Sequence, residues 1–183
     1  GSSGETLTFE LPAPVTEASR FGSLSIISSP GDLNGDGMAD IAVAVSLQPG
    51  SLSGLEFDHE GVYILFGRED WTATVDLLAD ADVALGDFDP GVPLFVDSAG
   101  NLNGDPFDDL LISTGGEDPL VQVYYGRDDV SLALMPFATA DETFIIHDQP
   151  GGAAANVAGV GDVNGDGLDD LAVVDATLDR VSM

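Results

Sequence analysis

The sequence predicts an all-β protein built of repeated four-stranded units. A pattern rich in Asp, Asn and Gly occurs at 31–43 as GDLNGDGMADIAV, returns at 161–173 as GDVNGDGLDDLAV, and appears in altered form at 100–112 as GNLNGDPFDDLLI. Each copy runs directly into a short apolar stretch, which is typical of a buried strand. The copies lie 69 and 61 residues apart, and no segment between them indicates a convincing helix. A long repeat with about four short strands is typical of a β-propeller blade.

The strands of each unit can be placed in order. Gly22, Gly91 and Gly152 each stand nine residues before a loop, and Gly22 opens a small, mostly apolar run. Strands are expected after the loops, at 41–45, 110–113 and 171–174, and then at 61–66 and 121–125. A fourth strand is expected at 74–78 or 81–85 in unit one, and at 143–147 in unit two. The alternating segment 5–10 is a further candidate strand.

We divide the chain by this repeat. Residues 1–4 (GSSG) resemble a cloning scar, and 5–20 form an N-terminal strand and connector. The blades occupy 21–183, with unit one at about 21–87, unit two at about 88–148 and an incomplete unit three at about 149–183. A propeller needs about four to eight blades. These two and a half blades are therefore expected to be a fragment, or a partial ring that another copy or chain completes. The N-terminal strand is expected to pair with the last blade, and a sandwich of independent domains is the structural alternative.

The repeated loop has the composition of a calcium site. Side-chain oxygens stand at loop positions 1, 3, 5 and 9, and a glycine at position 6 permits a sharp bend. Ca²⁺ binds six to eight hard oxygen ligands, which such a turn can gather. Position 12 is apolar rather than the glutamate of an EF-hand, so we expect position 9 to complete the site together with the position 7 carbonyl. A plain hairpin turn without metal is the alternative. The predicted ligands are Asp32, Asn34, Asp36, the Met38 carbonyl and Asp40 in unit one, and Asp162, Asn164, Asp166, the Leu168 carbonyl and Asp170 in unit three.

These motifs resemble a known family. Phe21-Gly22, the loop from Gly31 to Gly37 with Asp40, and Gly61-Val62-Tyr63 are similar to the FG-GAP repeat of integrin α-subunit propellers and their bacterial relatives. The resemblance covers most of 21–183 and implies a propeller that binds Ca²⁺ on one face and recognises ligands on the other. It implies the same calcium ligands in units one and three.

Unit two departs from the family pattern. Asn101 replaces the first aspartate and Pro106 the position 6 glycine, and proline holds φ near −65°. Whether this loop binds calcium stays open. The residues that could still supply ligands are Asn103, Asp105, the Phe107 carbonyl and Asp109.

Composition limits the partners. The chain has 33 acidic residues, four arginines and a net charge of −29. Nucleic acids and anionic membranes attract Lys and Arg, so neither is expected as a partner, and no apolar stretch has the length of a membrane span. Cysteine is absent, which excludes disulfides and thiolate chemistry. Such an acidic surface suits a saline or calcium-rich exterior, where salt screens self-repulsion.

Catalysis is not predicted. His59 and His147 have no nucleophile in a recognisable motif, and adjacent acids such as Asp108 with Asp109 are expected by chance in so acidic a chain. Arg68 and Arg127, at matching places in their units, are expected to pair with local carboxylates. Trp71 is expected to pack at a sheet edge rather than to stack on a sugar.

We therefore expect a calcium-binding propeller module of an extracellular or cell-surface protein, acting in adhesion or in binding a protein or glycan. Two alternatives are the non-catalytic propeller of a secreted hydrolase or lyase, and a self-assembling structural protein.

Overall fold

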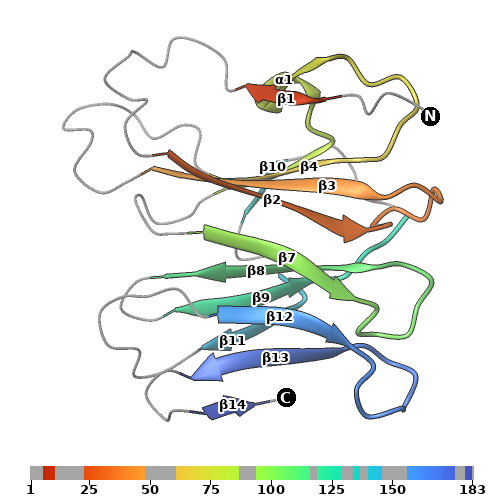
Figure 1. Ribbon diagram of the computed structural model, residues 1–183, viewed down its shortest axis with the longest axis vertical. Coiled ribbons are helices and arrows are strands. Elements are labelled where there is room, and N and C mark those ends of the chain that lie inside the picture. Colours follow the sequence, from red (N-terminus) through yellow and green to blue (C-terminus); the bar gives the residue numbers. More distant parts are fainter. Residues whose placement is uncertain are drawn as a thin grey trace.

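The computed structural model describes residues 6–10, 23–47, 61–86, 94–115, 119–128, 134–136, 140–145, 156–175 and 180–182. Over these residues the protein is all-β apart from one helical turn. Three mainly antiparallel sheets lie one above another, with a small pair of strands at one end of the stack (Figure 1). None of the sheets closes on itself within the described part of the chain.

The first sheet belongs to unit one. Its strand order is β10-β6-β4-β3-β2. The bounds are β2 (Ser23–Gly31), β3 (Asp40–Leu47), β4 (Gly61–Leu65), β6 (Val83–Gly86) and β10 (Leu134–Pro136). The strands β2, β3, β4 and β6 pair antiparallel in chain order, as predicted for a four-stranded unit. The fifth strand was not predicted: β10 comes from unit two and pairs parallel with β6.

The second and third sheets repeat this order. The second is β11-β9-β8-β7 and the third is β12-β13-β14. The bounds are β7 (Leu94–Gly100), β8 (Asp109–Thr114), β9 (Leu120–Tyr124), β11 (Glu142–Ile145), β12 (Asn156–Gly161), β13 (Asp170–Asp175) and β14 (Arg180–Ser182). All pairings in these two sheets are antiparallel. The strands predicted from the apolar runs that follow each loop are confirmed.

Apolar faces hold the sheets together. One buried cluster joins Ala42, Val62 and Leu85 of the first sheet to Leu94 and Ile112 of the second. Another places Leu111 and Val123 of the second sheet against Val157 and Leu171 of the third. The first strands, β2, β7 and β12, contact one another in succession. Because aliphatic side chains fill both gaps, burial of apolar surface is the main stabilising term between units.

The N-terminal strand covers the outer face of the first sheet. The strand β1 (Thr8–Glu10) pairs parallel with β5 (Thr74–Asp76), and α1 (Leu77–Asp80) follows β5 directly. Val75 and Leu77 pack against Val43 and Leu65 of the first sheet in one buried cluster, and Phe9 packs against this cluster. The expectation that this strand would pair with the last blade is therefore wrong: it pairs within unit one. The predicted strand at 74–78 is also shorter than expected, because the Asp76 side chain accepts hydrogen bonds from Leu78 N and Ala79 N and starts a helical turn.

No helix in the described ranges is long and apolar enough to cross a membrane.

Candidate metal sites

The three predicted loops join consecutive antiparallel strands at the same edge of the stack (Figure 1). We name them loop 1 (32–40), loop 2 (101–109) and loop 3 (162–170), and number their positions 1 to 9. Each follows a strand that ends in a glycine with positive φ: Gly31, Gly100 and Gly161. The predicted strand–loop–strand arrangement is confirmed.

Asp32 organises loop 1. Its Oδ1 accepts hydrogen bonds from Gly35 N at 2.7 Å and Asp36 N at 3.0 Å, and its Oδ2 accepts one from Gly37 N at 2.8 Å. The backbone can wrap around this carboxylate because Gly35 and Gly37 have φ of 77° and 87°, a region that other residues rarely adopt. Asn34 Oδ1 accepts from Asp36 N at 3.1 Å, which draws positions 3 and 5 into the same turn.

Loop 3 repeats this geometry. Asp162 Oδ1 accepts from Gly165 N at 2.6 Å and Asp166 N at 3.1 Å, and Oδ2 accepts from Gly167 N at 2.9 Å. These hydrogen bonds, with that from Gly167 the largest contribution, lower the pKa of Asp162 below its usual value. Asn164 Oδ1 accepts from Asp166 N at 2.8 Å. The two loops with the full sequence pattern thus fold alike.

Loop 2 reaches the same shape without a charge at position 1. Asn101 Oδ1 accepts from Gly104 N at 2.8 Å, as the position 1 aspartates do, and Gly104 has φ of 78°. Pro106 has no N–H to donate, and the second oxygen that would accept it is replaced by the Asn101 amide nitrogen. That nitrogen donates to the Asp105 carbonyl instead. The two departures noted in the sequence therefore compensate each other. Loop 2 keeps its shape without a glycine at position 6.

The position 9 aspartates are buried between loop and sheet. Asp40 Oδ2 accepts from Leu33 N and its Oδ1 from Gly67 N, both at 2.8 Å. Asp109 makes the same two bonds in unit two, with Leu102 N and Gly126 N. Both carboxylates are fully buried. Burial raises the pKa of Asp40 to about 6 and raises that of Asp109 as well.

Asp170, the third position 9 aspartate, is only partly buried. Its Oδ2 accepts from Val163 N at 2.9 Å, and its Oδ1 accepts from the Asn164 amide at 3.2 Å. Position 9 therefore has a structural role in all three units, since it fixes the start of the loop in each.

The donor set of loops 1 and 3 fits a hard cation. Each loop has a carboxylate at positions 1, 5 and 9 and an amide oxygen at position 3, and oxygen is the ligand that Ca²⁺ prefers. The two ion pairs among the described residues join Arg68 to Asp82 and Arg127 to Asp141, so neither neutralises a loop. As they stand, no three His, Cys, Asp or Glu side chains of the described ranges meet closely enough to hold a metal. The predicted sites also use an asparagine oxygen and the backbone carbonyls of Met38 and Leu168.

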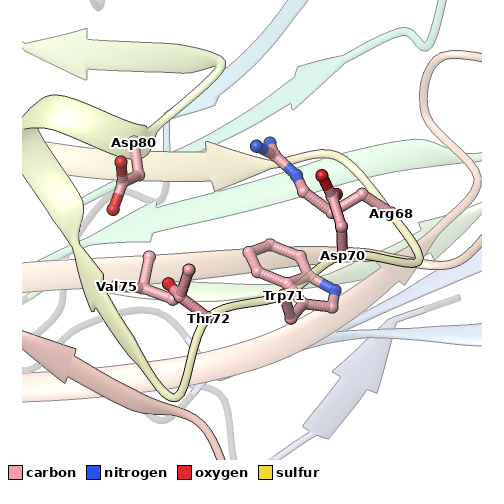
Figure 2. A pocket seen from close by; sticks show the side chains of 6 residues that line it. All are labelled: Arg68, Asp70, Trp71, Thr72, Val75 and Asp80. Carbon is pink, nitrogen blue, oxygen red and sulfur yellow. The ribbon is translucent and has the colours of Figure 1, made fainter.

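A small pocket beside unit one contains Trp71. Figure 2 shows Arg68, Asp70, Trp71 and Asp80 around it, and Thr72 and Val75 complete its lining. The Arg68 guanidinium carbon lies 4.8 Å from the centre of the Trp71 ring. Trp71 packs against the buried cluster that contains Val75 and Leu77. The expected local pairing of both arginines is confirmed. Trp71 packs against the protein as expected, and its exclusion from sugar stacking stays a prediction.

Two further outcomes concern residues outside the loop ligands. His59 and His147 lie outside the described residues. Sequence reasoning missed Asp108 and Asp169 at loop position 8, which contact the preceding loop. The sequence did contain a signal for this role: loops 2 and 3 have aspartate at position 8, whereas loop 1 has Ala39.

Comparison with protein-family models and with curated proteins finds no match to this chain.

Proposed function

We propose that this protein is a calcium-stabilised repeat module of the propeller type, belonging to an extracellular or cell-surface protein that acts in adhesion or in binding a protein or glycan. Loops 1 and 3 are the proposed calcium sites. The observation that carries the proposal is that loops 1 and 3 wrap their backbone around the position 1 carboxylate in the same way, while no arginine of the described residues pairs with either loop. A divalent cation bound in a loop would neutralise the negative charges of its aspartates and fix the hairpin.

The arrangement of the loops supports a structural role for the cation. Each loop sits at the turn between the first two strands of its sheet, and each position 9 aspartate connects the loop to the interior. A cation held by positions 1, 3, 5 and 9 would therefore link the loop to the first two strands of its unit. A rigid edge of this kind is suited to hold the remaining loops in place for a protein or glycan ligand.

The resemblance to FG-GAP repeats supports the propeller assignment. The successive sheets, of five, four and three described strands, contact one another through their first strands, which is what consecutive blades require. Loop 2 is proposed to hold its shape without calcium, because the Asn101 amide supplies the contact that the charged loops lack.

Thermal melting with and without calcium tests the proposal. At a calcium concentration ten times Kd, each site adds about 1.4 kcal/mol to the free energy of unfolding. Two sites would raise Tm by roughly 6–12 °C for a domain of this size. Magnesium and sodium chloride at matched ionic strength are the controls, because screening alone stabilises a chain of charge −29. A Tm that EDTA leaves unchanged at fixed ionic strength would refute the calcium sites.

A further inference from the structure

Position 8 of each later loop forms a joint with the loop before it. Asp108 Oδ2 accepts from Asp32 N at 2.8 Å, and Asp108 N donates to the Asp32 carbonyl at 3.0 Å. Asp169 makes the same reciprocal pair with Asn101, at 2.7 and 3.0 Å. One residue of the later loop thus satisfies both backbone groups of position 1 in the earlier loop. The same joint occurs twice, so it is a property of the repeat.

In each earlier unit two glycines make room for this joint, one just before the loop and one at loop position 4. A Cβ at Gly31 or Gly100 would overlap the carboxylate of Asp108 or Asp169. At position 4, a Cβ on Gly35 would meet the Phe107 ring, and one on Gly104 would meet Leu168. Each joint therefore places a carboxylate at position 8 and a large apolar side chain at position 7 of the incoming loop against these two glycines.

Loop 3 has the backbone groups and glycines that form the earlier side of this joint, but among the described residues no later loop contacts them. Among the described residues, no atom of another unit lies near the open side of Gly161 or Gly165, and no group pairs with the backbone of Asp162. Val163 is 54% exposed, whereas its counterpart in loop 1, Leu33, is 4% exposed beneath unit two. Loop 3 therefore repeats the surface through which loops 1 and 2 contact the next unit, and no other unit in the described part of the chain covers it.

A second copy of this chain is poorly suited to cover that surface. Its first loop has Ala39 at position 8 and so lacks the carboxylate. The outer face of its first sheet is already covered by Phe9, Val75 and Leu77. Among the described residues, joints therefore run in one direction only, from loop 1 to loop 2 and from loop 2 to loop 3.

We propose that the exposed rim of loop 3, formed by Gly161, Asp162, Val163 and Gly165, is a docking surface for a further repeat unit with aspartate at loop position 8 and a large apolar residue at position 7. The surface continues an interface that the chain already forms twice. The docked unit would accept a hydrogen bond from Asp162 N, donate one to the Asp162 carbonyl and bury Val163. Ala39 prevents unit one from forming this joint.

An extended chain tests the proposal. Val173 pairs with Ser182, and its counterpart Ile112 pairs with Gln122. Met183 therefore corresponds to Val123, and a copy of residues 124–183 placed after Met183 continues the repeat in register. The extension supplies a fourth strand for unit three and a fourth loop containing a copied Asp169. The matched control has Asp169→Ala in the copied segment only.

The readout is amide hydrogen exchange at Asp162, measured by NMR at fixed calcium concentration. We expect the extended chain to exchange this amide several-fold to about tenfold more slowly than the parent, which is the worth of one net hydrogen bond. The Asp169→Ala control should return the rate to that of the parent. Slow exchange at Asp32 and Asn101 verifies that units one to three are folded in every sample.

Two results would overturn the proposal. The first is an Asp162 amide that exchanges at the parent rate in an extended chain whose Asp32 and Asn101 amides exchange slowly. The second is Asp162 protection in the parent that increases with protein concentration, which would make a second copy the occupant despite Ala39.

Discussion

Loops 1 and 2 follow the same backbone path but close it in different ways. In loop 1 the carboxylate of Asp32 accepts three N–H groups. In loop 2 the amide of Asn101 accepts one and donates another to the Asp105 carbonyl. The comparison teaches that the fold of the loop does not require the charge. The carboxylate at position 1 of loops 1 and 3 therefore calls for a separate explanation, and we propose that it is cation binding.

The largest expected effect is the loss of unfolding free energy when a position 9 aspartate is replaced. Measuring it with and without calcium distinguishes the structural role of position 9 from its proposed role as a ligand. Asp40→Ala and Asp109→Ala each leave one buried and one partly buried N–H group without its partner, and a buried group left in this way costs about 1–3 kcal/mol. Relief of the burial cost of the carboxylate offsets part of this loss. In calcium-free buffer both variants should therefore lose about 2–4 kcal/mol in urea unfolding.

With saturating calcium the two position 9 variants should differ. Asp40→Ala should fall further below the wild type than Asp109→Ala, because it also removes a proposed ligand. The exposed Asp70→Ala is the control, with a change within about 0.5 kcal/mol. Equal losses for both variants in calcium would contradict the distinction between the loops.

Exchanging the two loop types should move calcium sites. Asn101→Asp with Pro106→Gly restores the full pattern in loop 2, so we expect one additional bound calcium in competition against a fluorescent chelator. Asp32→Asn removes one charge from loop 1 and should weaken that site about tenfold, because ligand charge tunes affinity in such loops. If the double variant binds no additional calcium, position 1 charge is not what distinguishes the loops.

The predictable part of the fold lies within each unit. Apolar runs after Asp40, Asp109 and Asp170 identified β3, β8 and β13, because a short buried strand has a local signal. The partner of β1 and the existence of β10 depend on which sheet edges are free, and a three-residue strand that contains Pro136 has almost no local signal. The loop ligands could be predicted for the same reason as the strands, whereas the position 8 joint is a contact between units.

The pH dependence of the calcium-free protein should follow the buried carboxylates. The pKa of Asp40 is raised to about 6 from an unfolded value of about 3.9. The folded state therefore binds this proton more tightly, and the resulting stability is present below about pH 4 and lost as pH rises through about 6. Asp109 acts in the same direction, whereas the lowered pKa of Asp162 acts in the opposite one.

Between pH 5 and pH 7 only the raised pKa values of the buried aspartates act, because Asp162 is already deprotonated in both the folded and the unfolded state. Tm in calcium-free buffer should therefore be higher at pH 5 than at pH 7. Calcium should reduce the difference or reverse it, since it binds the deprotonated carboxylates. A calcium-free Tm that rises from pH 5 to pH 7 would show that these buried groups do not control stability.

The smallest effect is expected at the two arginines. Arg68 and Arg127 occupy matching places and pair with Asp82 and Asp141. Partly exposed pairs of this kind contribute at most about 1 kcal/mol. Arg68→Ala should cost more than Arg127→Ala, because Arg68 also lies over the Trp71 ring. Double-mutant cycles with Asp82→Ala and Asp141→Ala measure the two ion-pair coupling energies. A single-variant loss for Arg68→Ala that is no larger than that for Arg127→Ala would contradict the role assigned to Trp71.

Isothermal titration calorimetry of the unmodified chain with calcium tests the central claim most directly. We predict two equivalents of bound calcium per chain, one in loop 1 and one in loop 3, with loop 2 contributing none. Binding of no calcium at millimolar concentrations would contradict the proposed sites, and three equivalents would contradict the assignment of loop 2.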